Sequence, residues 1–178
     1  MAGCRSFRRV RVLFDPHEPR YPAGNPARVI TFEETRREHC PILARNMREG
    51  DKRECEDVGF TPQKAVWRSY RHSLMARTYF VDGELAAIVG MGGNALSDTG
   101  APWLFTTYAV ERVPLGFVRH SRAYVEEMLS VKPFLENYVS ANYPQAVKFV
   151  QAVGFTLGET VLIGDQRAMF YRFFMERN

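Results

Sequence analysis

The chain has 178 residues, of which 46% are hydrophobic and 13% aromatic, a composition typical of one globular domain and not of a disordered segment. Its three cysteines are odd in number and show no CxxC spacing, which argues against a disulfide framework or a metal site and favours a reducing compartment. No apolar run approaches the roughly 20 residues that cross a bilayer, and the arginine-rich start lacks the apolar segment of a secretory signal. These features exclude a membrane or secreted protein from our expectations.

The net charge of +4 is concentrated at the N-terminus. Residues 1–28 contain six arginines and only two acidic residues, Asp15 and Glu18. In the rest of the chain the numbers of basic and acidic residues are equal. We therefore expect a basic, proline-rich arm over 1–26 and a neutral domain over 27–178 that does not bind nucleic acid. The arm is either a solvated segment, upstream sequence from a misassigned start, or a contact for nucleic acid or an acidic protein.

The first half of the domain predicts one strand, two helices and a hairpin. Residues 27–30 read as a short strand, and the capping box of Thr31 and Glu34 then predicts a helical region that Pro41 breaks or kinks. Thr61-Pro62 predicts a second helix as far as about residue 73. Strands over 76–81 and 84–89 flank Asp82-Gly83, a dipeptide that suits a tight type I′ turn.

The second half predicts a strand over 102–110, followed by the best amphipathic helix of the chain, from Phe117 to Leu129. Residues 134–140 alternate as a half-buried strand does. Asn142-Tyr143-Pro144 then predicts a capped helix start, and Gly154-Phe155 predicts its left-handed end. The chain closes with a hairpin whose strands are 160–163 and 168–174.

The segment from Asn142 to Gly154-Phe155 resembles the strand-helix unit that forms one wall of the acetyl-coenzyme A slot in the Gcn5-related N-acetyltransferase (GNAT) superfamily. The predicted order of elements is also similar to the GNAT order. The resemblance implies an α/β (α+β) fold with a single domain, whose mixed, mostly antiparallel sheet carries helices on both faces.

A narrower resemblance rests on four blocks: Leu43-Ala-Arg-Asn-Met-Arg48, Thr61-Pro62, Ala101-Pro-Trp-Leu104 and Phe117-Val-Arg-His-Ser-Arg122. Together they look like a family of GNAT-fold proteins of tailed bacteriophages, which includes gene-13-type internal virion or morphogenesis proteins. This resemblance implies a phage protein, located in the host cytoplasm or the virion, with other virion proteins as partners.

The GNAT resemblance also implies a coenzyme site. Pantetheine would lie between the strands 102–110 and 134–140, lined by Tyr108, Ala109 and Val110 on one side and by Asn137 to Ala141 on the other, with Asn142 in the wall. The pyrophosphate would face the turn from Arg112 to Gly116 that leads into Phe117. This turn departs from the family pattern, because the second glycine is not clearly present and Pro114 removes a donor. Arg119 and Arg122 either compensate or are solvated surface residues.

The sequence indicates the catalytic residues less clearly than it indicates the coenzyme site. Many GNAT members place a proton-donating tyrosine where this chain has Val150, so Tyr143 or Tyr138 would have to substitute, unless both are core residues. Attack by an amine needs a base, and the candidates are Glu111, Glu136 and His120, each of which could instead be a surface or capping residue.

The resemblance thus implies an acetyl-CoA-dependent N-acetyltransferase that uses no metal and acts on a protein or a small amine. The alternative is a non-catalytic virion or assembly protein that has kept the fold. Val150 and the altered phosphate turn favour this alternative.

Overall fold

A computed structural model describes residues 28–94 and 96–177, and the expected arm over 1–26 lies outside these residues. The described chain forms one seven-stranded mixed sheet, five α-helices and a short 3-10 helix. In chain order the elements are β1 (Ile30–Glu34), α1 (His39–Asn46), α2 (Glu49–Asp57), α3 (Pro62–Arg71), β2 (Ser73–Val81), β3 (Glu84–Gly93), β4 (Thr99–Thr106), η1 (Tyr108–Arg112), α4 (Pro114–Val131), β5 (Phe134–Ser140), α5 (Pro144–Val153), β6 (Thr156–Ile163) and β7 (Ala168–Glu176). None of the described helices combines the length and apolarity needed to cross a bilayer.

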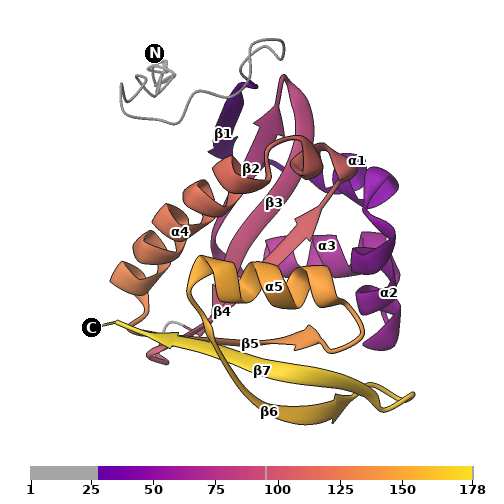
Figure 1. Ribbon diagram of the computed structural model, residues 1–178, viewed down its shortest axis with the longest axis vertical. Coiled ribbons are helices and arrows are strands. Elements are labelled where there is room, and N and C mark those ends of the chain that lie inside the picture. The colour runs from indigo at the N-terminus through magenta and orange to yellow at the C-terminus, as the bar shows by residue number, and fades with distance from the viewer. Residues whose placement is uncertain (1–27, 95, 178) are drawn as a thin grey trace, which may run out of the picture.

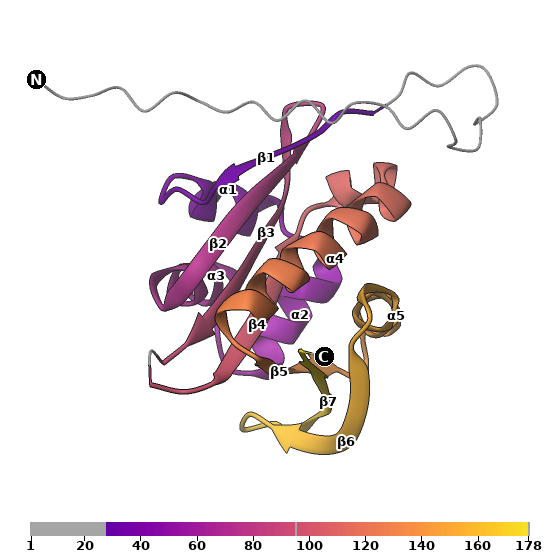
Figure 2. The same cartoon turned by 90° about the vertical axis from the view of Figure 1, so that its left-hand side faces the viewer.

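The sheet has the strand order β1-β2-β3-β4-β5-β7-β6 and is antiparallel except where β4 meets β5. Helices α1 and α3 cover one face of β2 and β3, and α4 covers the other, with α5 beside it over β5 (Figures 1 and 2). Each face buries its own apolar cluster, one centred on Leu43, Val66 and Ile88 and the other on Tyr124 and Met128. The predicted fold class is therefore confirmed, including the helices on both faces.

Several local predictions are also confirmed. Asp82 and Gly83 have φ values of 51° and 83°, as a type I′ hairpin turn requires. The Thr61 hydroxyl accepts a hydrogen bond from the Lys64 N–H at 3.3 Å and so caps α3. Gly154 ends α5 in the left-handed conformation, with φ of 116°.

The N-terminal prediction was wrong in detail. The capping-box residues Thr31 and Glu34 lie in β1, which pairs along its whole length with β2, and the first helix begins only at His39. Pairing with β2 satisfies the backbone groups of β1 that face this strand, so the tertiary contact overrides the local signal. The predicted single helical region is divided at Met47 into α1 and α2.

Two boundaries in the second half also need correction. The strand predicted over 102–110 ends at Thr106, because the Thr107 hydroxyl accepts a hydrogen bond from the Ala109 N–H at 3.2 Å and starts η1. Asn142 does not cap α5, since the N-cap position belongs to Tyr143, which makes no side-chain cap.

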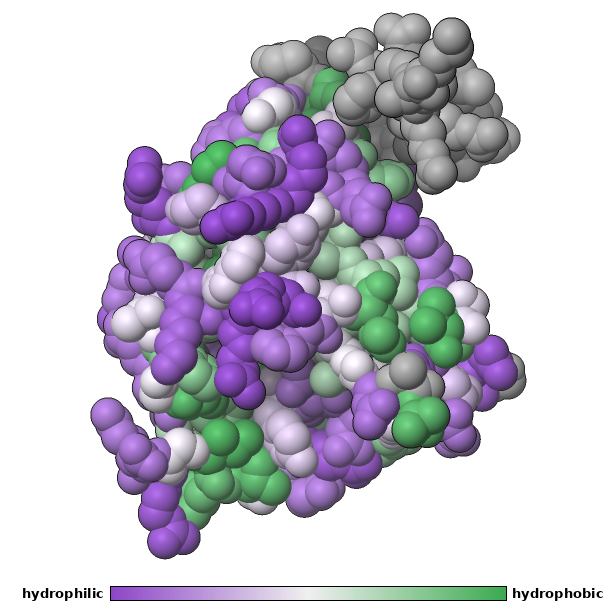
Figure 3. Space-filling view, turned by 180° about the vertical axis from the view of Figure 1, so that it is seen from behind, coloured by the Kyte–Doolittle hydropathy of each residue, from purple (hydrophilic) through white to green (hydrophobic). Residues whose placement is uncertain are grey.

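The exposed surface is mixed in character. Seen from behind, hydrophilic side chains alternate with separate hydrophobic patches (Figure 3). Exposed large apolar residues include Leu74, Leu96 and Leu162. On this face the apolar groups are thus divided among several small areas.

The last position at which β4 pairs with β5 is occupied by a glycine, Gly100. A Cβ added to Gly100 would overlap the Met91 side chain and lie 3.0 Å from Leu135 Cδ2. We expect Gly100→Ala to lower the free energy of unfolding by about 1–3 kcal/mol through overpacking, measured by denaturant unfolding. Gly92→Ala is the matched control, because its Cβ would make only ordinary contacts of 3.5 Å or more. Equal effects of the two substitutions would contradict the close packing at Gly100.

Candidate functional site

The sheet opens into a fork between β4 and β5. These parallel strands pair only at Thr99 with Phe134 and at Gly100 with Leu135, after which they diverge. Because alternate residues of β4 point their backbone groups away from β3, Pro102, Leu104 and Thr106 face the fork. The fork is therefore a slot lined by strand backbone, and its open end lies at the carboxyl ends of both strands.

Side chains satisfy some of the backbone groups along this slot. The Asn137 side chain donates from Nδ2 to the Pro102 carbonyl at 2.8 Å and so bridges the fork near its closed end. At the open end, the Thr106 N–H donates to Asp51 Oδ2 at 2.9 Å. Leu104 lies between these two bridges, beyond the part of β4 that pairs with β5.

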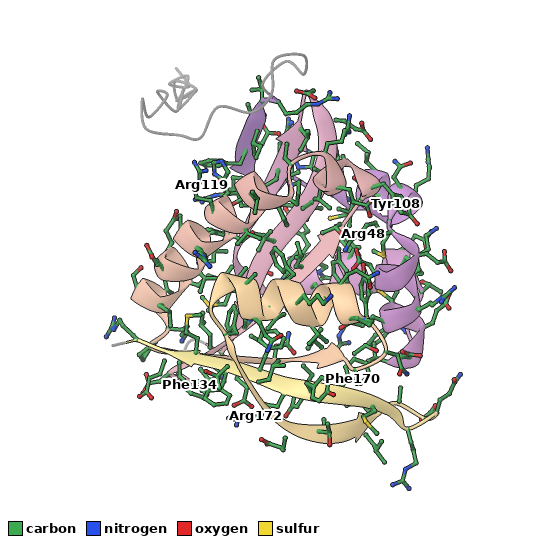
Figure 4. All side chains as sticks on the ribbon, in the orientation of Figure 1. Arg48, Tyr108, Arg119, Phe134, Phe170 and Arg172 are labelled. Atoms are coloured by element: carbon green, nitrogen blue, oxygen red, sulfur yellow. The ribbon has the colours of Figure 1, made fainter. Side chains whose placement is uncertain are left out.

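Helix α2 lies across the open end of the fork. Arg48 occupies its N-cap position, and Asp51 and Glu54 follow at intervals of three residues, so all three project from one side of the helix. Arg48 and Tyr108 lie together where η1 approaches this part of the chain (Figure 4). The chain thus places one cation and two carboxylates at the end of the slot.

Asp51 is the most strongly held of these groups. Its carboxylate is buried and accepts hydrogen bonds from both the N–H and the hydroxyl of Thr106. Burial raises the pKa of Asp51, whereas the bonds from Thr106, the charge of Arg48 and a hydrogen bond with Tyr143 oppose the increase. The carboxylate therefore connects α2 to the end of β4.

Arg48 connects the same elements through its guanidinium. Its Nη2 donates to the Tyr143 hydroxyl at 2.6 Å, and its Nη1 lies 3.5 Å from a carboxylate oxygen of Glu111. Its Nε lies 3.8 Å from Asp51 Oδ2 and is buried without a hydrogen-bond partner among the described residues. The Arg48 backbone N–H also donates to the Thr106 carbonyl at 3.0 Å, which fixes the start of α2 against β4.

Tyr143 lies against α2 because residue 50 is a glycine. A Cβ added to Gly50 would overlap the Tyr143 ring, so the bare helix surface is what allows the ring to approach. The tyrosine is buried, and this burial together with the negative charge of Asp51 raises the pKa of its hydroxyl. Tyr143 is therefore neutral and keeps its proton at physiological pH.

Glu54 lies near the other strand of the fork. Burial, and then the neighbouring charge of Asp51, raise its pKa to about 8, and the Ser140 backbone opposes the increase. Ser140 is the last residue of β5, so this carboxylate approaches the end of that strand.

The structure brings together some of the predicted site residues. Glu111 and Tyr143 both contact Arg48, and the Tyr108 hydroxyl accepts a hydrogen bond from the Glu49 N–H at 3.4 Å. Glu136 is not part of this group. It pairs with Arg172, which lies across β7 from α5 (Figure 4).

The residues expected to hold the coenzyme are divided between the core and the surface. Ala109, Val110 and Phe117 are buried in the apolar cluster under α4, so their side chains do not line the fork. Tyr108 belongs to η1 and not to the strand edge, and Asn142 is exposed.

The predicted phosphate turn opens α4 as expected, but its groups are partly engaged. Arg112 pairs with Glu84, and a Cβ on Gly116 would lie 2.8 Å from the terminal methyl of Ile30, so this glycine lies close to β1. Pro114 has no N–H, which leaves the N–H groups of Leu115 and Gly116 without intrahelical partners. The turn therefore fits a single anionic group, and the fork fits an extended chain with amide groups.

The described residues contain no group of three or more His, Cys, Asp and Glu side chains arranged to hold a metal ion. Sequence reasoning missed Arg48, Asp51, Glu54 and Thr106. The signal that could have found the first three is Gly50, a glycine inside an otherwise strongly charged helix, which indicates close approach of another element.

Glu54 should give the folded chain a pH-dependent stability. Its pKa is about 8 in the folded chain and 4.5 ordinarily, so protonation favours the folded state. The free energy of unfolding should therefore fall as pH rises from about 4.5 to 8. We expect Glu54→Gln to reduce this slope, measured as Tm against pH. Glu56→Gln, exposed on the same helix, is the control and should retain the wild-type slope. Identical profiles for the two variants would contradict the role of Glu54.

Gly50→Ala provides a test of the contact with Tyr143. Alanine in a helix is normally more favourable than glycine by about 0.5–1 kcal/mol. Here we expect the opposite sign, because the new Cβ would displace the Tyr143 ring. In a double-mutant cycle, Gly50→Ala should destabilise the wild type but have little destabilising effect in the Tyr143→Ala background, where the ring is absent. Simple additivity would show that the two residues are not in contact.

No protein-family model and no curated protein sequence matches the chain. Solved structures do match. A ribosomal L7/L12 α-N-protein acetyltransferase in complex with coenzyme A superposes with a TM-score of 0.61 and 10% identity, over 83% of this chain and 94% of that one. A putative acetyltransferase from Salmonella typhimurium with its cofactor acetyl-CoA gives 0.58 and 9%, over 84% and 94%. A spermidine N-acetyltransferase from Vibrio cholerae gives 0.58 and 10%, over 83% and 94%. At these identities the likeness shows the fold, which is that of the GNAT acetyltransferases.

Proposed function

We propose that the chain is an acetyl-CoA-dependent N-acetyltransferase whose slot is the fork between β4 and β5. The observation that carries the proposal is the pairing that ends at Gly100 and Leu135, which leaves strand backbone facing an open gap. A charged cluster containing Arg48 lies at the end of this gap, where a reactive group can be handled. Known structures with this fold contain acetyl-CoA or coenzyme A, which supports the choice of coenzyme.

The chain offers residues for each part of the coenzyme. Leu104 presents backbone groups to the middle of the fork, and the Leu115 and Gly116 N–H groups at the start of α4 face an anion with the help of the helix dipole. When bound, acetyl-CoA supplies a thioester as the acyl source.

We assign proton transfer to two of the predicted catalytic residues. Glu111 is exposed beside Arg48, where it can accept a proton from an approaching ammonium group. Tyr143 carries its proton at neutral pH and is the candidate acid, although burial raises its pKa and makes it a weaker acid than a free tyrosine. Val150 packs against the apolar cluster and has no such role.

The acceptor is a protein or a small amine. Structures with this fold include enzymes named for ribosomal proteins and for spermidine, so the fold admits both classes. The phage-family resemblance favours a host or phage protein as the acceptor, and the host cytoplasm or the virion as the location.

One observation favours a second candidate, a non-catalytic virion or assembly protein. Asn137 and Asp51 already satisfy backbone groups on β4 that an enzyme would present to its coenzyme. In this case these hydrogen bonds would close the fork, and α2 would stabilise the diverging strands without binding a coenzyme.

Calorimetric titration with acetyl-CoA tests the first candidate against the second. We expect saturable binding and a rise in Tm, since a ligand at 100 times its Kd stabilises the folded state by about 2.7 kcal/mol. ATP is the control for adsorption of anionic nucleotides to basic residues. Equal effects of ATP and acetyl-CoA, or no effect of either, would contradict coenzyme binding and favour the structural protein.

Tyr143→Phe tests the proposed acid. The phenylalanine ring keeps the contact with Gly50 and loses the hydroxyl. We expect acetylation of a generic primary amine to fall at least about tenfold while the Kd for acetyl-CoA stays the same. An unchanged rate would remove Tyr143 from the chemistry.

A further inference from the structure

We propose that the open end of the fork contains a pocket for one carbonyl or carboxylate oxygen, and that Asp51 fills this pocket as an internal plug. The Asp51 carboxylate must move away from Thr106 before the oxygen of an acyl group can bind there. This inference rests on the proposed function for the identity of the acyl group, whereas the pocket itself is defined by the described residues alone.

The first observation is that two donors of one residue converge on one atom. Asp51 Oδ2 accepts both the Thr106 N–H, at 2.9 Å, and the Thr106 hydroxyl. A backbone N–H and a hydroxyl that meet at one oxygen form a binding site for that oxygen, whichever molecule supplies it.

The second observation is that Asp51 leaves one donor unused. Arg48 Nε is buried, has no hydrogen-bond partner in the part of the chain that the structure describes, and lies 3.8 Å from Asp51 Oδ2. A buried guanidinium N–H without an acceptor is unfavourable. An oxygen placed slightly closer to Arg48 than Asp51 Oδ2 would satisfy this donor as well as those of Thr106. The pocket is therefore better suited to another oxygen than to the one that fills it.

The third observation concerns the cost of displacing the plug. Burial raises the pKa of Asp51 in spite of its hydrogen bonds, which means that the ionised carboxylate is less favoured here than in water. Asp51 lies in the first turn of α2, only three residues after the N-cap. Rotation of its side chain toward solvent would return the carboxylate to water and free the Thr106 donors together.

The pocket predicts a preference between two ligands that differ only in the acyl group. Coenzyme A ends in a thiol, whereas acetyl-CoA carries a thioester carbonyl at the same end, which can be placed against Thr106. In the wild-type chain the gain from this carbonyl is offset by the loss of the bonds of Asp51. Removal of the plug should therefore tighten acetyl-CoA binding and leave coenzyme A binding unchanged.

The experiment uses full-length Asp51→Ala, with Asp51→Asn as the matched control that keeps an acceptor oxygen in place. Sodium acetate at 100 mM, compared with sodium chloride, should raise the Tm of Asp51→Ala by about 2–4 °C. It should leave the Tm of the wild type and of Asp51→Asn unchanged. In calorimetry, Asp51→Ala should bind acetyl-CoA at least about tenfold more tightly than coenzyme A, whereas the wild type binds both equally.

The two readouts separate this inference from the proposed function. A Tm shift with acetate but no coenzyme binding by any variant would support the pocket and overturn the coenzyme proposal. Coenzyme binding without the acetate shift, and with no preference for acetyl-CoA in Asp51→Ala, would overturn the pocket and retain the coenzyme proposal.

A second measurement needs no substitution, in case Asp51→Ala does not fold. In ¹⁵N-labelled wild-type protein, the Thr106 amide resonance should move on saturation with acetyl-CoA and stay in place with coenzyme A, because only the acyl ligand changes the acceptor of this N–H. Equal movement with both ligands would overturn the proposal.

Discussion

Two strands that begin paired and then diverge leave backbone groups that need other partners, and this constraint organises one end of the molecule. β4 and β5 share only two paired positions, so beyond Gly100 and Leu135 the N–H and C=O groups that face the fork have no partner strand. A buried backbone group without a partner costs about as much as a lost hydrogen bond. Side chains supply the missing partners: Asn137 donates to the Pro102 carbonyl, and Asp51 accepts from the Thr106 N–H.

This constraint explains the unusual composition of α2. The helix is strongly polar, yet Asp51 and Cys55 on it are buried. Its carboxylates are required where strands end, since a carboxylate can accept from several N–H and O–H donors at once. Gly50 completes the arrangement, because only a bare helix surface lets the Tyr143 ring approach. The polarity of α2 therefore reflects the fork and not only an exposed helix.

The parts of the fold that the sequence predicts are those governed by local periodicity and turn chemistry. Asp82-Gly83, the apolar face of α4 and the end of α5 at Gly154 are examples, as each depends on neighbours within a few residues. The capping box at Thr31 failed because pairing with β2 overrides it. The cluster at the fork was not predictable in this way, since Arg48 meets Tyr143 across 95 positions of the chain and no local pattern reports such a contact.

The hydrogen bonds from Thr106 to Asp51 bear on both candidate functions, because a ligand that enters the fork must compensate for the free energy of these bonds. A hydrogen bond to a charged group contributes about 1.5–3 kcal/mol net, so a ligand that displaces Asp51 must replace the bonds from Thr106 with an oxygen of its own. A ligand without such an oxygen leaves buried donors unsatisfied and is disfavoured. A ligand with one also gains Arg48 Nε, which has no acceptor while Asp51 is in place. Selection for an oxygen at this position would thus follow from the hydrogen-bond requirements of the donors that Asp51 leaves when it is displaced, without a dedicated recognition loop.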